Sequence, residues 1–232
     1  MTDFHTHILP GIDDGAPNLQ VSLKMLGMME AQGIRQVVAT PHFYANHDHP
    51  RRFLERRQEA ENALRKALRN VDAPRLHIGA EVHYFDGMSD CELLEALTID
   101  QSKYLLVEMP HATWTDRHYR ELVGMYQKCG ITPVIAHVDR YISPLQTHGI
   151  PETLEELPVL VQANASFFTR RGTRKLALRL LRKGQIHLLG SDCHNLTDRK
   201  PNLSEAMQII QKHLGDGALK RIAQYEMEVL GE

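Results

Sequence analysis

The sequence has little of what marks several classes of protein. It holds three cysteines, none in a Cys-x-x-Cys pair, so neither a disulfide framework nor a thiolate metal site is expected. No apolar run approaches the roughly 20 residues of a membrane span. The first residues also lack the charged and apolar regions of a signal peptide. These absences predict a reduced, cytoplasmic protein that does not insert into a membrane.

The charge balance argues against a nucleic-acid partner. Lys and Arg number 27 against 29 Asp and Glu, which leaves a net charge of −2 over 232 residues. The chain has one tryptophan and no basic stripe interleaved with aromatic residues, which disfavours a nuclease or proofreading module. Histidine, in contrast, is abundant: 14 histidines stand against 7 tyrosines and 6 phenylalanines. Histidine is the commonest metal ligand and titrates near neutral pH, so this excess indicates metal or acid–base chemistry.

Short apolar runs alternate with amphipathic segments along the whole chain, which predicts one α/β domain over residues 1–232. The pattern favours a parallel sheet closed into a barrel. An open doubly wound sheet is the alternative, disfavoured because no Gly-x-Gly-x-x-Gly follows the first strand. The predicted strands are Asp3–Leu9, Gln36–Thr40, Leu76–Val82, Tyr104–Met109, Thr132–His137, Val159–Ala163 and Ile186–Gly190. The predicted helices are Leu19–Gly33, Arg51–Asn70, Ser89–Leu97, Asp116–Lys128, Arg174–Lys183, Ser204–Leu214 and Leu219–Leu230.

Metal-capable side chains follow nearly every predicted strand. In a barrel of parallel strands the functional groups collect at the carboxyl ends of the strands, so these side chains should meet on one rim. Side chains alternate along a strand, so His5 and His7 share one face, and Asp192 shares a face with His194. A single His-x-His is weak evidence, but its repetition on consecutive strands predicts a metal site. The candidate ligands are His5, His7, Asp14, His42, Glu81, Glu108, His137, Asp192 and His194.

These segments resemble the PHP (polymerase and histidinol phosphatase) superfamily. They are more closely similar to the bacterial protein-tyrosine phosphatases of that superfamily encoded with capsule and exopolysaccharide genes. The resemblance runs from the first residues to near Pro201. Its segments are His5–Gly15, Ala39–His42, Gly79–Glu81, Val107–Pro110, Ala136–Tyr141 and Ser191–Asn195.

The resemblance implies a distorted (β/α)7 barrel of the TIM type that holds three divalent metal ions. The ligand set contains nitrogen and oxygen only, which suits Mn, with Fe or Zn as alternatives. The implied sets are His5, His7, Glu81 and Asp192 for the first ion, Glu81, Glu108 and His137 for the second, and Asp14, His42 and His194 for the third.

Two arginines are the candidates for binding the substrate's phosphate. Arg140 and Arg199 match arginines of the phosphatase branch, and a guanidinium binds phosphate oxygens in forked geometry. Cys193 and Arg199 also have the Cys-x5-Arg spacing of cysteine-dependent phosphatases. The five residues between them lack the glycine that such a phosphate loop needs, so a thiol mechanism is disfavoured. The loop His47–Arg52 either lies in solvent or contacts a protein substrate.

The predicted function is metal-dependent hydrolysis of phosphotyrosine by a metal-activated water. By resemblance, the substrate is an autophosphorylated bacterial tyrosine kinase that regulates capsular or exopolysaccharide synthesis. One alternative is a PHP phosphatase for a small ester such as histidinol phosphate, and another is a non-catalytic metal-binding interaction module. The oligomeric state, including a homo-oligomer, stays open.

Overall fold

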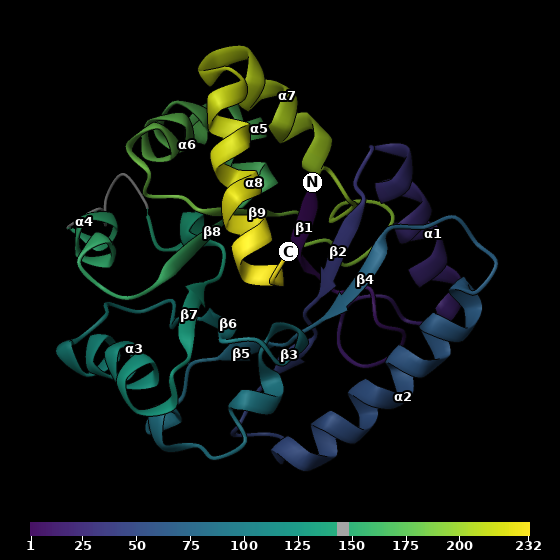
Figure 1. Cartoon of the computed structure of the whole chain (residues 1–232), viewed down its shortest axis with the longest axis horizontal. Helices are drawn as coiled ribbons and strands as arrows, with labels where there is room; N and C mark the ends of the chain where they lie inside the picture. The colour runs from purple at the N-terminus through teal and green to yellow at the C-terminus, as the bar shows by residue number, and fades with distance from the viewer. Residues whose placement is uncertain (143–148) are drawn as a thin grey trace.

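The computed structural model describes residues 1–142 and 149–232. Parallel strands curl around a common centre, and most of the helices lie outside them (Figure 1). The strands are β1 (Thr2–Thr6), β2 (Gln36–Ala39), β3 (His42–Phe43), β4 (Arg75–Ile78), β5 (Glu81–His83), β6 (Tyr104–Glu108), β7 (Thr132–Ile135), β8 (Leu160–Asn164) and β9 (Leu188–Gly190). The helices are α1 (Leu19–Ala31), α2 (Pro50–Leu68), α3 (Asp116–Cys129), α4 (Ile150–Glu155), α5 (Ala165–Thr169), α6 (Arg171–Lys183), α7 (Leu203–Leu214) and α8 (Asp216–Leu230).

Two sheets combine into a distorted ring. One sheet has the order β1-β2-β4 and the other the order β3-β5-β6-β7-β8-β9. A parallel bridge between Thr6 and Cys193 brings the end of β9 back to β1. Since β3 continues β2 and β5 continues β4 after short breaks, the nine described strands occupy seven positions. The predicted distorted (β/α)7 barrel is confirmed.

Helix prediction was wrong for Ser89–Leu97, which forms two short 3-10 turns, Met88–Asp90 and Glu95–Leu97. The carboxylate of Glu121 on α3 accepts hydrogen bonds from the backbone N–H groups of Gly87, at 3.0 Å, and Ser89, at 3.1 Å. These two hydrogen bonds hold the start of the segment against α3. The short helices α4 and α5 were not predicted.

The apolar core has an inner and an outer layer. Phe4, Leu106 and Val134 belong to a cluster of buried residues from the inside of the ring, together with Val229 of α8. Neighbouring residues on the same strands, such as Leu105, belong to the larger cluster that packs under the surrounding helices. This alternation follows from the two-residue period of a strand that is covered on both faces.

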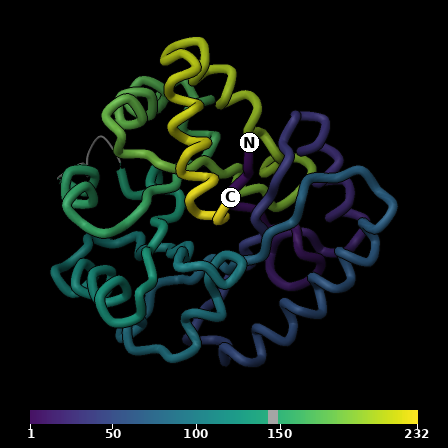
Figure 2. Tube along the Cα trace, in the orientation of Figure 1, coloured from purple at the N-terminus to yellow at the C-terminus, as the bar shows by residue number. Residues whose placement is uncertain are grey.

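The amino ends of the strands are closed by α8, which passes over them beside both chain termini (Figures 1 and 2). Glu226 on this helix accepts a hydrogen bond from the Thr2 N–H at 3.1 Å, and the Tyr104 hydroxyl donates to Glu228 at 2.5 Å. The carboxyl ends of the strands lie at the opposite side of the ring. In the described ranges, none of the helices combines the length and apolar composition that a membrane crossing requires.

Candidate metal centre

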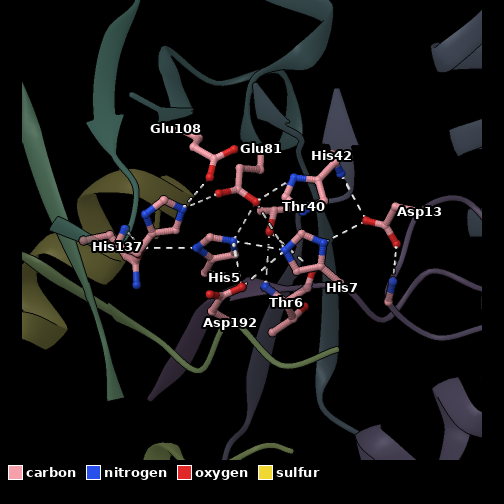
Figure 3. Close-up of polar contacts among 12 residues, drawn as sticks. His5, Thr6, His7, Asp13, Thr40, His42, Glu81, Glu108, His137 and Asp192 are labelled. Carbon is pink, nitrogen blue, oxygen red and sulfur yellow. Dashed lines mark hydrogen bonds and ion pairs between the residues drawn. The ribbon is translucent and has the colours of Figure 1, made fainter. Parts of the chain in front are cut away.

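All nine predicted ligands meet at the carboxyl ends of the strands. Each has a side-chain nitrogen or oxygen within 3.6 Å of an atom from another member of the set, and Figure 3 shows the central part of this cluster. His42 and Glu81 begin β3 and β5, Glu108 ends β6, and the other ligands lie on β1 or follow β1, β7 and β9. The carboxyl ends of parallel strands lie on one rim, which is why residues up to 189 positions apart converge.

Glu81 occupies the middle of the cluster and is 1% exposed. Its Oε2 atom lies 3.0 Å from His5 Nε2, 3.3 Å from His7 Nε2 and 3.1 Å from His42 Nδ1. Its other oxygen, Oε1, is 2.8 Å from His137 Nε2. Burial by itself would raise the pKa of this carboxyl, but the charge of His5 and the imidazole hydrogen bonds hold it well below the usual range. Glu81 is therefore a carboxylate whose two oxygens face different imidazoles.

A second group lies beside Glu81. Ligand atoms of His7, Asp14, His42 and His194 all fall within 4.8 Å of one another. Asp14 Oδ1 is 3.4 Å from His194 Nε2 and 3.5 Å from His42 Nε2. Burial and the positive charge of His7 lower the pKa of His194 to about 4, so its imidazole is neutral at neutral pH and keeps a lone pair for a ligand.

The grouping differs in detail from the implied ligand sets. The other two tight groups are His5, His7 and Glu81, and His42, Glu81 and Glu108. Asp192 lies outside them, with Oδ1 3.6 Å from the Nε2 atoms of both His5 and His7. His137 also lies outside, with Nε2 3.4 Å from Glu108 Oε1. The structure thus brings the nine residues together, and His7, His42 and Glu81 each belong to two of the three tight groups.

The cluster has the properties of a cation site. His42 Nδ1, Glu81 Oε2 and His194 Nε2 are buried and accept or donate no hydrogen bond in the described part of the chain. The Nε2 atoms of His5 and His7 face each other at 3.1 Å. Buried polar atoms in proteins are almost always paired, so a divalent ion would satisfy atoms that the protein leaves unpartnered. The nitrogen and oxygen donors fit a transition-metal ion.

Further side chains orient the imidazoles. His5 Nδ1 is 3.2 Å from Gln162 Oε1, and His7 Nδ1 is 2.8 Å from Asp13 Oδ2. Each contact directs the Nε2 atom of the histidine toward the cluster, as is usual for metal-binding histidines. Burial disfavours the charged form of His7, but the carboxylates of Asp13 and Glu81 beside it outweigh that effect and raise its pKa to about 10.

Sequence reasoning did not assign these orienting residues. Asp13 stands next to Asp14 in the segment His5–Gly15 of the resemblance, so its position in the sequence could have indicated a role at the site. Gln162 is a buried glutamine inside β8, and no sequence pattern marks it. Its Oε1 also accepts a hydrogen bond from the His137 N–H at 2.6 Å, so one amide positions ligands on two strands.

The backbone at the site is strained and tightly packed. His137 and Asp192 have positive φ angles of 31° and 54°, which non-glycine residues rarely adopt. Gly190 lies two residues before Asp192, and a Cβ atom at position 190 would lie 2.5 Å from the Cβ of His5. The site therefore needs glycine at position 190 so that β9 can approach β1.

Both predicted arginines lie at the edge of the cluster and contact Asp192. Arg140 Nη2 donates to Asp192 Oδ2 at 2.5 Å, and Arg199 Nη2 donates to Asp192 Oδ1 at 2.8 Å. Arg140 also reaches Glu108 at 3.3 Å, and Arg199 Nη1 lies 3.9 Å from Asp14. Both side chains are about one-third exposed. Guanidinium groups are thus held between the carboxylates and solvent.

Two further side chains lie at the cluster. His83 Nδ1 lies 3.1 Å from Glu108 Oε2, which is where an orienting residue would lie. Cys193 is fully buried, and burial raises the pKa of its thiol well above the usual value. A buried, protonated thiol cannot attack a substrate, so the Cys-x5-Arg spacing carries no chemistry here.

The curled ring of parallel strands, with imidazoles and carboxylates gathered at its carboxyl end, defines a (β/α) barrel with a candidate metal centre. A family model described as "Capsular polysaccharide synthesis, CpsB/CapC" matches residues 1–230. The chain therefore belongs to the CpsB/CapC family.

Individual relatives agree with this membership. The chain is 32% identical to the tyrosine-protein phosphatase YwqE of Bacillus subtilis, with 93% of the chain and 85% of that protein covered. It is 30% identical to the tyrosine-protein phosphatase CpsB of Streptococcus pneumoniae, with 96% and 94% covered. A crystal structure from work on YwqE and CpsB, described as unique metal-dependent tyrosine phosphatases, superposes with a TM-score of 0.82 at 26% identity, over 98% of this chain and 93% of that one.

A more distant structure shares the fold alone. The histidinol phosphate phosphatase of Lactococcus lactis superposes with a TM-score of 0.58 at 16% identity, over 91% of this chain and 92% of that one. The same ring of strands therefore occurs outside the CpsB/CapC family.

Proposed function

We propose that this chain is a metal-dependent tyrosine-protein phosphatase. The observation that carries the proposal is the convergence of nine imidazole and carboxylate side chains at one end of the ring, in a chain of the CpsB/CapC family. The relatives named above are tyrosine-protein phosphatases, and the proposal extends that activity to this chain. We further propose that residues 1–232 form one domain, because strands from both ends of the chain contribute to one ring.

We propose three divalent ions, with Mn as the first candidate and Fe or Zn as alternatives. When bound, such ions lower the pKa of a coordinated water and neutralise the charge of a phosphate ester. Support comes from the buried, unpartnered atoms and from the nitrogen and oxygen donor set. The proposed ligands are His5, His7, Glu81 and Asp192 for the first ion, Glu81, Glu108 and His137 for the second, and Asp14, His42 and His194 for the third.

The two arginines would bind the phosphoryl oxygens. Arg140 and Arg199 reach Asp192 from two sides, so their guanidinium groups flank the carboxylate at the edge of the cluster. Their partial exposure leaves N–H groups for an incoming phosphate, and the forked guanidinium matches two phosphate oxygens. The leaving phenol of tyrosine has a pKa of about 10, so it departs with less help from a proton donor than a serine alkoxide needs.

The proposed physiological substrate is an autophosphorylated bacterial tyrosine kinase that regulates capsular or exopolysaccharide synthesis. The description of the family, capsular polysaccharide synthesis, supports this choice. A relative of the same family, the CpsB protein of Streptococcus pneumoniae, is named for its tyrosine-phosphatase activity.

The test is to measure initial hydrolysis rates on a phosphotyrosine peptide, a phosphoserine peptide and histidinol phosphate. Each substrate is assayed with added Mn²⁺ and with a chelator, for the natural protein and for Cys193→Ser. We expect metal-dependent preference for phosphotyrosine that the cysteine substitution leaves unchanged. A higher rate on histidinol phosphate would instead indicate a phosphatase for a small phosphate ester. Bound metal without hydrolysis of any of the three would indicate a non-catalytic metal-binding module.

A further inference from the structure

A cavity of about 680 Å³ opens beside the metal centre. We call it the Tyr44 groove. Asp14 and His42 of the metal centre line it, and so do Tyr44 and two arginines from the first turns of α2, Arg52 and Arg56. The groove therefore runs between the predicted ligands and a helix that contributes none of them.

Tyr44 directly follows β3 and lies against the metal centre. Its ring centroid is 5.3 Å from the His42 ring, with 30° between the planes, and 5.4 Å from the His83 ring. These two rings contact part of the tyrosine, yet 37% of the residue stays exposed. The contacts with neighbouring rings hold the side chain in place, and its remaining surface is available to a ligand.

The other large aromatic residues near the site are engaged elsewhere. Trp114 and Tyr141 are buried, at 7% and 5% exposure, and pack against each other at 5.0 Å. The Tyr141 hydroxyl accepts a hydrogen bond from the Met109 N–H at 2.9 Å. Tyr126 is exposed, but it belongs to α3 and lines no part of the groove. Among the phenylalanine, tyrosine and tryptophan residues that the structure describes, Tyr44 is thus the one that lines the groove.

The chemistry of the substrate indicates what this surface contacts. In an aryl phosphate, one ester oxygen separates the phosphorus from the ring, so a phosphoryl group bound at the metal centre places the ring at the wall of the site. Aromatic rings pack favourably against one another in offset or edge-to-face arrangements. We infer that Tyr44 is a specificity-determining residue that packs against the phenyl ring of the phosphotyrosine and selects aromatic over alkyl phosphate esters. This inference rests on the proposed function.

Binding measurements separate recognition of the ring from recognition of the phosphate. Phenylphosphonate and methylphosphonate share the phosphonate group and differ in the ring, so the ratio of their dissociation constants isolates the contribution of the ring. We would measure both by calorimetry on the Mn²⁺-loaded protein and on its Tyr44→Leu and Tyr44→Phe variants. The matched control is Tyr126→Leu, which removes an exposed tyrosine far from the groove.

We expect Tyr44→Leu to reduce the preference for phenylphosphonate by about two- to tenfold, the size of one aromatic packing contact. Tyr44→Phe and Tyr126→Leu should preserve the preference. An unchanged ratio in Tyr44→Leu, whether both ligands keep their affinity or both weaken equally, would overturn the inference. Absence of hydrolysis of a phosphotyrosine peptide by the natural protein would instead contradict the proposed function, so the two failures are distinguishable.

A separate observation concerns the charges of the groove. Arg56 pairs with Asp48, and Asp13 pairs with His7. Arg52 is exposed and forms no ion pair with any residue that the structure describes. We propose that Arg52 binds an acidic side chain next to the phosphotyrosine in a protein substrate. A cation at the wall of a substrate groove attracts such a group more strongly at low ionic strength.

Peptides with and without acidic residues beside the phosphotyrosine test this proposal. Arg52→Ala should remove a two- to fivefold preference in kcat/KM for the acidic peptide, about the size of an exposed ion pair, at low salt. Arg51→Ala removes the neighbouring exposed arginine, which does not line the groove, and should leave the preference intact. The assignment would be refuted if the natural protein had the same kcat/KM for both peptides. It would also be refuted if Arg52→Ala and Arg51→Ala lost the preference for the acidic peptide to the same extent.

Discussion

The two ends of the strand ring differ in what fills them: a helix packs over the amino end, and polar side chains crowd together at the carboxyl end. At the amino end, α8 closes the ring, Val229 packs into the inner core and Thr2 hydrogen-bonds to Glu226. At the carboxyl end, buried imidazoles and carboxylates crowd together, and two ligand residues have positive φ angles. The first arrangement packs apolar side chains and pairs polar ones, and the second crowds together groups that a bound cation would bring into balance.

This difference indicates where substitutions will act. Buried like groups and unpartnered polar atoms destabilise a fold, so the carboxyl end is expected to add little to the stability of the metal-free protein. The apolar seal at the amino end contributes stability without contacting substrate. In barrels of this kind, residues of the carboxyl face serve activity and those of the amino face serve stability. Four predictions sharpen or break this comparison.

The largest effect is expected for His5→Ala. His5 Nε2 contacts Glu81 at the centre of the cluster, so its loss should lower kcat on a phosphotyrosine peptide by about 10³-fold or more. The natural protein should also gain about 2.7 kcal/mol of stability at a Mn²⁺ concentration 100 times its Kd, and the variant should gain less at that concentration. Steady-state kinetics and thermal unfolding with and without metal check both statements. Full activity in a folded variant would remove His5 from the site.

Asp13→Asn should have the next largest effect. The carboxylate of Asp13 accepts a hydrogen bond from His7 Nδ1 and orients the imidazole, while burial opposed by the His7 contact leaves its pKa lowered to about 2. Removing such an orienting carboxylate typically weakens metal binding 10- to 100-fold. Metal affinity measured by calorimetry is the readout, and Asp198→Asn, an exposed aspartate in a turn, is the control. Unchanged affinity would make Asp13 a structural residue only.

At the amino end, Val229→Ala should act on stability and spare activity. Val229 is 1% exposed and packs in the inner core, so its truncation should lower the free energy of unfolding by roughly 1–3 kcal/mol. Met227→Ala on the same helix removes an exposed side chain and should change stability by less than about 0.5 kcal/mol. Denaturant unfolding measures both. A loss of kcat in Val229→Ala at temperatures where it is folded would show that the two ends are coupled.

The smallest effect concerns pH and His187, whose ring packs edge-on against Tyr225 of α8 at 4.7 Å. Burial lowers its pKa from 6.5 to about 4. Between these values the unfolded chain binds a proton that the folded chain does not, so stability is highest above pH 6.5 and falls as the pH drops toward 4.

His187→Asn keeps an acceptor for the Val161 N–H but has no group that titrates in this range. The natural protein should therefore lose roughly 1–2 kcal/mol more than this variant between pH 7 and pH 5. Parallel pH dependence in the two proteins would contradict the assignment. Urea unfolding at a series of pH values provides the comparison.

Local patterns were sufficient for much of the fold and the candidate ligands. Tyr104–Glu108 reads as a buried strand that ends in a carboxylate, and both features are local. The segment Ser89–Leu97, predicted as a helix, forms short 3-10 turns, and the N–H groups at its start are bound by Glu121, over 30 positions away, a contact that no local pattern contains. Gln162 was missed for the same reason, since its importance comes from His5 and His137 on other strands.

The sequence by itself determined the alternation of strands and helices and the identity of the metal-capable residues, because strand period, apolar runs and residue type are properties of neighbouring positions. Only the tertiary structure decided which atoms meet. Closure of β9 onto β1 places Asp192 beside His5 and His7, where Arg140 and Arg199 both reach it. Curling of the strands gives Glu81 four imidazole neighbours from three segments of the chain. These contacts depend on strand register and ring curvature, which arise from packing across the whole molecule.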